Sequence, residues 1–471
     1  MSKYIIASSK DWFQNSKTTK EFEEFNFIYL NNKEDLELSK IEKINPRFIF
    51  FPHWSWMVPK EIHQNYDCVV FHTAPLPYGR GGSPIQNLIL RNFKESPVCA
   101  LKMNNILDGG PIYLTKEVSL LGSADEIFMR ENTATGLYEY VATYVDDLCL
   151  VMKEPETFLT ILQSEPYNFK LKGSGPVSFH LGCGFERDEQ TGILAMTPQK
   201  YIEKMNLTYQ HLYGEPPNKS AQSPLEENDH PELDTSEFLD EEGIQQYQSL
   251  IGSMQWLIAI GRWDIQTAVM SLSSFRAQPR KGHIKRVKRI YGYINRFKLF
   301  DLKFRTEEPE MSQFDNKTNF DWSKSIYGDH SEELPDNAPK PLGKRVTLTH
   351  YFDANLMHDV LSGKAVTGII HLINKTPIMW YSKKQATSET ATYGAEFVAG
   401  RTCIEQVIDL RNSLRYLGVP INDISYVFGD NETMINSSSF PHARLHKRHN
   451  ILTFHFVRSM IAKGFIALNH L

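Results

Sequence analysis

The chain has 471 residues, of which 41% are hydrophobic, 23% charged and 12% aromatic. This length suits about three domains, and the composition lets each bury a core, which excludes a disordered or collagen-like chain. The formal net charge of −5 excludes nucleic-acid binding by bulk electrostatics, so any such binding has to use local basic patches.

The cysteine pattern and the hydropathy of the chain indicate the compartment in which we expect the protein. The five cysteines are scattered, with no C-x-x-C pair, which predicts reduced thiols and no zinc site. No apolar stretch approaches about 18 residues, and the N-terminus carries no recognisable targeting signal. We therefore expect an intracellular, cytoplasmic protein with no membrane partner.

Residues 1–130 alternate short apolar runs with helical or loop stretches. Five runs are of β type: KYIIAS, NFIYL, RFIFFP, CVVFH and VCALKM. PIQNLILRNF and ADEIFMR have helical spacing. The alternation predicts a parallel sheet, whose ligands usually bind at the carboxyl ends of the strands.

A candidate acid–base pair lies in this first segment. His72 ends an apolar strand, and Asp108 follows another 36 residues later. A lone strand-end histidine is most often a core residue, but a carboxylate partner and a neighbouring glycine-rich loop favour proton transfer. The candidate ligand-binding residues around the pair are Arg80, Gly81, Gly82 and Gly109.

The histidine–LP–RG–P loop and the later D-x-G-x-I resemble the folate-dependent formyltransferase family. The resemblance implies a Rossmann-like sheet and transfer of a formyl group from 10-formyltetrahydrofolate to an amine, on an amino sugar nucleotide or an aminoacyl-tRNA. It makes His72 the proton-transfer residue and Asp108 its partner. The family usually has an asparagine where this chain has Val70, and Asn104 and Asn105 are possible substitutes for that donor.

The formyltransferase-like pattern stops at Glu131, so we expect that domain to be clipped within its last helix. Further along, TYVDDLCLVM predicts a hairpin with Asp146 and Asp147 at its turn. Such a pair is usually a solvated turn, but it is also a divalent-metal site in polymerases. An acidic, proline-containing loop at 226–243 and a long helical region follow.

A basic helix, RKGHIKRVKRIYGYINRFK, ends the helical region. Its cations either track a nucleic-acid backbone or form an ordinary solvated face. The candidate phosphate contacts on it are Lys281, Lys285, Arg286, Lys288 and Arg289.

The YVDD tetrad and the segments after it, in order and spacing, resemble copia-type reverse transcriptase over residues 131–305. The resemblance implies an α+β palm remnant over 131–240 and a helical thumb over 241–305. Polymerisation by two metal ions needs a further aspartate from an upstream strand, and formyltransferase-like sequence stands there instead. We therefore predict that Asp146 and Asp147 cannot support DNA synthesis.

Residues 306–345 are polar and proline-bearing, which predicts a linker, and mixed α/β texture follows over 346–471. Asp353 and Asp430 end strand-like runs, and Glu396 lies on an amphipathic helix. Each acid alone is most often an exposed charge or a helix cap. Together, carboxylates on a sheet and a neighbouring helix can hold two magnesium ions.

This last segment resembles the retrotransposon RNase H domain, through the strand Asp, SKKQ-x(10)-AEF, GDN and the closing LHKRHN–FHFVR. The resemblance implies Mg²⁺-dependent cleavage of the RNA strand of an RNA–DNA hybrid. Many members have a fourth acid where this chain has Ile451, and His449 or Asn450 are possible replacements. The candidate phosphate contacts are Lys383, Lys384, Lys447 and Arg448.

The sequence thus predicts an α/β multidomain chimera joined near residue 130, whose surviving activity is that of RNase H. Two alternatives stay open. One is a working amine formyltransferase with an inert C-terminal passenger. The other is an inactive nucleic-acid-binding protein.

Overall fold

The computed structural model describes residues 3–9, 25–52, 54, 56–76, 95–105, 108–119, 127–144, 147–165, 167–315, 320–327, 334, 338–445 and 450–471. The chain divides into two compact units, residues 1–128 with 141–149, and residues 129–140 with 150–471. All five cysteines are free thiols. None of the helices in the described ranges is long and apolar enough to cross a membrane.

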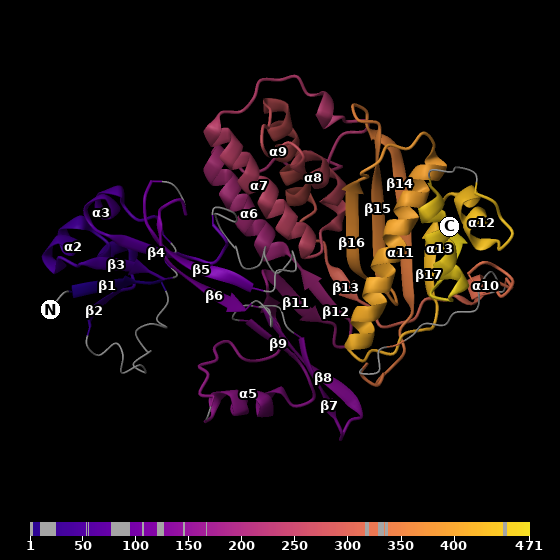
Figure 1. Cartoon of the computed structure of the whole chain (residues 1–471), viewed down its shortest axis with the longest axis horizontal. Coiled ribbons are helices and arrows are strands. Elements are labelled where there is room, and N and C mark those ends of the chain that lie inside the picture. Colours follow the sequence, from indigo (N-terminus) through magenta and orange to yellow (C-terminus); the bar gives the residue numbers. More distant parts are fainter. Residues whose placement is uncertain are drawn as a thin grey trace. The chain divides into compact units, whose positions relative to one another are not determined.

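A six-stranded sheet forms the centre of the first unit (Figure 1). Its order is β2 (Asn26–Leu30), β1 (Lys3–Ala7), β3 (Phe48–Phe51), β4 (Cys68–His72), β5 (Glu95–Lys102) and β6 (Ile112–Ser119). The helical elements are η2 (Lys33–Asp35), α2 (Leu38–Ile44) and α3 (Lys60–Asn65). Ile41 of α2 and Ile62 of α3 pack on the buried side chains of β1 and β3, so the two helices cover one face of the sheet.

The five β-type runs are confirmed, but the all-parallel arrangement is wrong. Strands β1 to β4 are parallel, whereas β5 runs antiparallel to β4 and β6 antiparallel to β5. The connection over residues 103–111 is too short for a parallel crossover, so β6, which sequence analysis missed, has to run back along β5. The predicted helix PIQNLILRNF lies outside the described residues.

A second, three-stranded sheet has the order β7 (Ile127–Asn132), β8 (Leu137–Tyr144), β9 (Asp147–Val151), and confirms the hairpin around YVDD. The helix predicted from ADEIFMR is wrong, because its last residues lie in β7. Asn132 Oδ1 accepts from the backbone N–H groups of Ala134 and Thr135, and Gly136 has φ 67°, which together form a turn. Arg130 and Asn132 both donate to the buried Glu139 of β8, and these cross-strand contacts favour a hairpin over a helix.

Two tyrosines of β8 contact the end of a helix far along the chain. The Tyr138 hydroxyl donates to the carbonyl of Lys340, and the Tyr140 hydroxyl donates to that of Leu417. A Cβ at Gly418 would lie 2.2 Å from the Tyr138 ring, so only glycine allows this approach. The contact fixes this part of β8 within the second unit.

The middle of the second unit is a helical body beside a small sheet. The antiparallel sheet has the order β10 (Phe179–His180), β11 (Cys183–Arg187), β12 (Leu194–Thr197), β13 (Leu302–Phe304). The helices are α5 (Pro155–Gln163), α6 (Gln199–Tyr213), η3 (Pro231–Leu233), α7 (Glu241–Ala259), η4 (Trp263–Ile265), α8 (Gln266–Ser273) and α9 (Lys281–Arg296). Apolar side chains of α6 to α9 share one core, which confirms the predicted helical region and basic helix.

The C-terminal part is a five-stranded sheet with the order β16 (Thr376–Lys384), β15 (Lys364–Ile373), β14 (Leu348–Asp359), β17 (Ser425–Gly429), β18 (Ile466–His470). The first three strands are antiparallel, and β17 and β18 run parallel to β14. The helices are α11 (Thr392–Tyr416), α12 (Glu432–Ser439) and α13 (Ile451–Ala462), and α11 lies along the sheet (Figure 1).

The segment predicted as a linker is in part a packed element. It contains α10 (Ser312–Asp315), and Phe314 packs on Phe428 of β17. Trp322 is 7% exposed and belongs to the core of the C-terminal sheet. The prediction of a plain linker was therefore wrong, because these aromatic side chains bury apolar surface within a polar stretch.

The buried guanidinium of Arg458 on α13 holds this segment. It donates to the carbonyls of Ser437, Phe440 and Pro441, and it lies over the ring of Trp322. Arg458→Met should lower the free energy of unfolding by about 3 kcal/mol or more, because one buried and two partly buried carbonyls lose their donor.

Urea denaturation followed by tryptophan fluorescence measures this loss. Arg401→Met is the control, because Arg401 is half-exposed, forms an ion pair with Glu405 one turn away on α11, and lies 5.8 Å from the centroid of the Phe456 ring. The control should change stability by less than about 1 kcal/mol. Equal effects of the two substitutions would contradict the structural role of Arg458.

Candidate functional site

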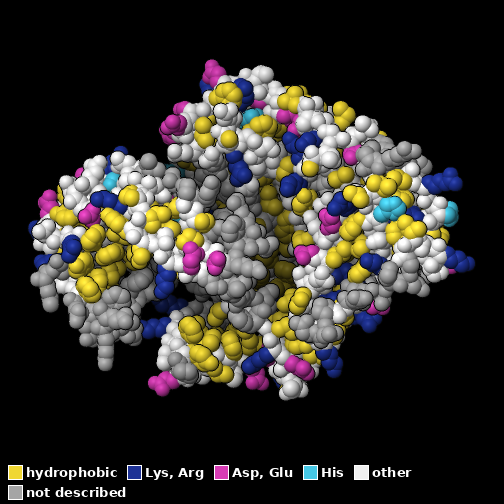
Figure 2. Space-filling view, viewed as in Figure 1, with side chains coloured by type: hydrophobic (Ala, Val, Ile, Leu, Met, Phe, Trp, Pro, Cys, Tyr) yellow, Lys and Arg dark blue, Asp and Glu magenta, His cyan; other side chains and the backbone are white. Residues whose placement is uncertain are grey.

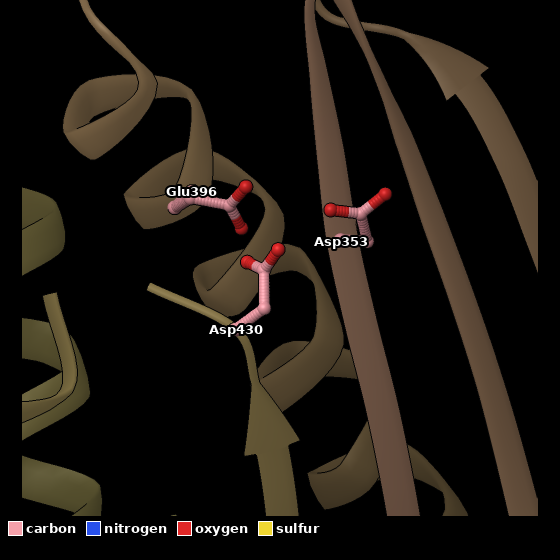
Figure 3. Close-up of side chains that lie close together, drawn as sticks. All are labelled: Asp353, Glu396 and Asp430. Carbon is pink, nitrogen blue, oxygen red and sulfur yellow. The ribbon is translucent and has the colours of Figure 1, made fainter. Parts of the chain in front are cut away.

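Three carboxylates converge on one side of the C-terminal sheet (Figure 3). Asp353 comes from β14, Glu396 from α11, and Asp430 follows directly after β17. One ligand oxygen from each lies within 4.8 Å of the others. The structure thus brings together the three acids that the sequence singled out at separate positions.

Close packing behind the carboxylates holds their three elements together. The Phe352 ring lies 2.6 Å from where a Cβ of Gly429 would stand, and 3.2 Å from the corresponding position at Gly400. Only glycine lets β17 and α11 approach this ring so closely. Since Phe352 adjoins Asp353, and Gly429 adjoins Asp430, the packing also sets the spacing of the acids.

The environment of the site disfavours three negative charges. Burial, followed by the charges of Asp353 and Asp430, raises the pKa of Glu396 to about 8. Burial and the charge of Asp430 also raise the pKa of Asp353. The backbone N–H of Ala354 donates to Glu396 Oε1, whereas the buried Oε2 has no hydrogen-bond partner among the described residues.

These features fit a divalent cation. Hard cations such as Mg²⁺ take carboxylate oxygens as ligands, and the positive charge offsets the repulsion among the acids. The unpartnered oxygen of Glu396 is one such free ligand. Within the described ranges, no other group of three His, Cys, Asp or Glu side chains offers ligand atoms this close together.

The position of the fourth acid has no carboxylate. Ile451 is the first residue of α13 and is 47% exposed, while Asn450 is 5% exposed. His449 lies outside the described residues. The described residue beside this position, Asn450, offers an amide as its polar group.

The YVDD acids are described only in part. Asp147 is the exposed first residue of β9, and Asp146 lies outside the described residues. Asp147 belongs to no close group of three possible ligands among the residues that the structure covers.

The basic helix α9 pairs with the acidic loop before α7. Arg286 donates both to Asp229 and to Asp234, and these interactions raise its pKa. Lys281 pairs with Glu237, and Arg289 pairs with Glu226. Lys288 makes a cation–π interaction with Tyr213, with its Nζ 3.5 Å from the ring centroid. The Lys285 side chain is exposed.

Most of the predicted phosphate contacts on α9 thus already bind acids of the same chain. On the visible face of the molecule, basic and acidic side chains are interspersed (Figure 2). On β16, Lys383 is exposed and Lys384 pairs with Asp359. Lys447 and Arg448 lie outside the described residues.

The predicted pair in the first unit is also brought together. His72 Nδ1 lies 3.4 Å from Asp108 Oδ2, and the two side chains are 7% and 11% exposed. His72 ends β4, and Asp108 has φ 50°, in the left-handed region, directly before Gly109. A Cβ on Gly110 would lie 1.6 Å from the Lys102 carbonyl, so this turn requires glycine.

The structure describes only some of the other residues predicted for that site. Arg80, Gly81 and Gly82 lie outside the described residues, and Gly109 is partly buried. Val70 offers no donor from its place on β4, between Phe51 and Leu101. Asn104 and Asn105, the possible replacements, are exposed after β5.

Comparison with known proteins separates the two parts of the chain. No family model matches. The retrovirus-related Pol polyprotein from transposon TNT 1-94 of Nicotiana tabacum is 24% identical over 320 residues, 68% of this chain and 21% of the polyprotein. Methionyl-tRNA formyltransferase of Campylobacter lari is 32% identical over 131 residues, 27% of this chain and 43% of the enzyme.

The chain is a chimera of formyltransferase-like and retrotransposon Pol-like segments. A solved methionyl-tRNA formyltransferase from Clostridium thermocellum is 43% identical over 26% of the chimera and 56% of that enzyme, with a TM-score of 0.25. The chimera spans about a fifth of the Pol polyprotein and less than half of the Campylobacter enzyme.

Sequence reasoning missed two features of the chimera. It identified the acidic loop and the basic helix but not their pairing, which their opposite charges favour. It also missed Glu389, an acid 8% exposed at the start of α11. The one sequence feature that could have indicated Glu389 is that it is a second acid, seven positions before Glu396.

In the absence of metal, the chimera should lose stability as the pH rises from about 4.5 to about 8. Over this range folded Glu396 keeps a proton that the unfolded chain has released, so raising the pH favours unfolding, by up to about 1.4 kcal/mol per pH unit. Glu396→Gln should reduce this slope. Thermal melts across the range, in EDTA, measure it.

Mg²⁺ at pH 8 should raise the melting temperature of the wild-type protein more than that of Glu396→Gln, because the ion takes the place of the proton. Glu405→Gln, at an exposed acid of the same helix, is the control and should keep the wild-type slope. A slope that Glu396→Gln leaves unchanged would refute the assigned pKa.

Proposed function

We propose that the chimera cleaves the RNA strand of RNA–DNA hybrids by a magnesium-dependent, RNase H-type reaction. The single observation that carries this proposal is the convergence of Asp353, Glu396 and Asp430 within 4.8 Å. The strand order β16-β15-β14-β17-β18, with α11 along the sheet, supports an RNase H-like domain over residues 346–471.

The three acids and Lys383 have different roles in the proposed cleavage. Bound Mg²⁺ would supply the attacking hydroxide and steady the leaving oxygen of the phosphodiester. Asp353 and Asp430 hold the metal site from the two strands, and Glu396 gives up its proton to complete it. The exposed Lys383 is a phosphate contact that positions the hybrid beside the acids.

We further propose that the polymerase-like part is a remnant without DNA synthesis. Its YVDD hairpin offers two adjacent aspartates, but the chain has formyltransferase-like sequence where the third, upstream aspartate should come. The described part of α9 supports the same view, because Arg286 and Arg289 pair with acids of the chain.

The purified full-length chimera should cleave a labelled RNA–DNA hybrid in Mg²⁺, and Asp430→Asn should lower the rate at least about 100-fold, because metal-site charge stabilisation is worth several kcal/mol. Gel analysis of the labelled strand measures cleavage. The same protein should extend no primer.

Three outcomes separate the hypotheses. Cleavage that survives Asp430→Asn would point to a contaminating nuclease and refute the proposal. Absence of cleavage at every Mg²⁺ concentration would also refute it. Hybrid binding without turnover, weakening steeply with salt, would favour an inactive nucleic-acid-binding protein.

A second candidate function is formyl transfer to an amine from 10-formyltetrahydrofolate. The observation that favours it is the buried contact between His72 and Asp108 at a strand end. In this reaction His72 would take the proton of the attacking amine, while Asp108 fixes the imidazole tautomer. Aminoacyl-tRNA and amino sugar nucleotides are the acceptor classes that the formyltransferase-like segment suggests.

If this site is active, His72→Ala should lower formyl transfer by about 10²–10⁴-fold, the usual contribution of a general base. Release of tetrahydrofolate, followed by absorbance, measures the reaction. His63→Ala, on α3, is the control and should leave the rate unchanged. A rate that His72→Ala does not affect would exclude the proposed base.

A further inference from the structure

Helix α11, which carries Glu396, lacks the usual N-terminal cap. Its N-cap residue is Ala391, which offers no side-chain hydrogen bond, and its first turn contains no acid. The first N–H groups of a helix have no partner within the helix, and Ser, Thr, Asp or Asn normally supplies one. A 25-residue helix with a catalytic acid in its second turn therefore needs another group at this end.

The carboxylate of Glu389 lies at this end. It precedes the N-cap by two residues and is only 8% exposed. A Cβ on Gly394, in the first turn of α11, would lie 2.2 Å from Glu389 Oε2. The carboxylate therefore occupies the space that any other side chain at position 394 would take.

A second buried polar group, the side-chain amide of Asn450, lies close to the same position. Asn450 is 5% exposed, and its Nδ2 has no hydrogen-bond partner within the described part of the chain, which leaves out residues 446–449. This nitrogen lies 3.3 Å from the Cβ position of Gly394. Glu389, Gly394 and Asn450 thus join the start of α11 to the start of α13.

We propose that Glu389 is a positioning residue for Glu396. Its negative charge stabilises the positive end of the α11 dipole, and its contact with Gly394 fixes the first turn. Glu389 does not belong to the group of three acids whose ligand atoms converge among the described residues, and its proposed role is exerted through the helix. The inference rests on the proposed RNase H-type function of the three acids.

The contact itself is tested by a four-protein stability cycle on the full chain: wild type, Gly394→Ala, Glu389→Ala and the double variant. Gly394→Ala should lower the melting temperature of the wild type, because the new methyl meets the carboxylate. In the Glu389→Ala background the same substitution should lower it much less, because only Asn450 Nδ2, 3.3 Å from the Cβ position, remains close. An equal loss in both backgrounds would overturn the contact.

The positioning role is tested by the Mg²⁺ dependence of hybrid cleavage. Glu389→Ala should raise the Mg²⁺ concentration for half-maximal rate by about 10-fold, a typical effect of a group that orients a metal ligand. The KM for the hybrid should not change, and Glu389→Gln should recover part of the loss. Glu405→Ala, further along α11, is the control.

Two failures are distinguishable. If Glu389→Ala melts at a lower temperature but keeps the wild-type Mg²⁺ dependence, Glu389 is merely structural and the positioning role is overturned. If the wild type cleaves no hybrid, calorimetric Mg²⁺ titration with Asp430→Asn as the non-binding reference replaces the assay. Equal Mg²⁺ affinity of wild type and Glu389→Ala there would overturn the inference alone, whereas no binding by the wild type would overturn the proposed function with it.

Discussion

The contact of the Phe352 ring with two glycines is the constraint on which the C-terminal site depends. Three carboxylates within 4.8 Å repel one another, and burial of Glu396 adds to the cost. Nothing in their own chemistry holds them together without a cation. The Phe352 ring packs between Gly400 and Gly429 and brings β14, α11 and β17 close together, so the three acids that these elements carry are held near one another. Dispersion and burial in the core thus stabilise a cluster that is electrostatically unfavourable.

Two arginines of the second unit hold parts of their own chain together. Arg286 is bidentate to Asp229 and also reaches Asp234, while Arg458 satisfies three backbone carbonyls beneath Trp322. A cation that already holds an acid offers a phosphate little net gain, because the existing pair must break first. This explains how a chain with a net charge of −5 can contain a strongly basic helix without presenting a basic surface there.

The sequence could predict those features that depend on residues close to one another in the chain. Asp430 ends an apolar run and Glu396 sits on an amphipathic helix, so their elements were predictable. Asp353 was predicted at a strand end, but β14 continues to Asp359, so this acid lies within the strand. The strand β7 was not predictable, because IFMR has apolar spacing that suits either element, and Glu139 on the opposite strand decides between them. Glu389 was equally hidden, because its role depends on the missing side chain of Gly394 and on Asn450, some 60 residues away.

The change of family near residue 130 does not coincide with a break between elements. Arg130 on one side of it binds Glu139 on the other, inside a single hairpin. That hairpin is held in turn by Tyr138 and Tyr140 at the end of α11, where Gly418 admits the Tyr138 ring. The start of the retrotransposon-like segment is therefore tied to the helix that carries Glu396, through contacts that involve no formyltransferase-like residue. The change of family falls within β7, and the tyrosine contacts that tie the hairpin to the end of α11 lie after it, within the second unit.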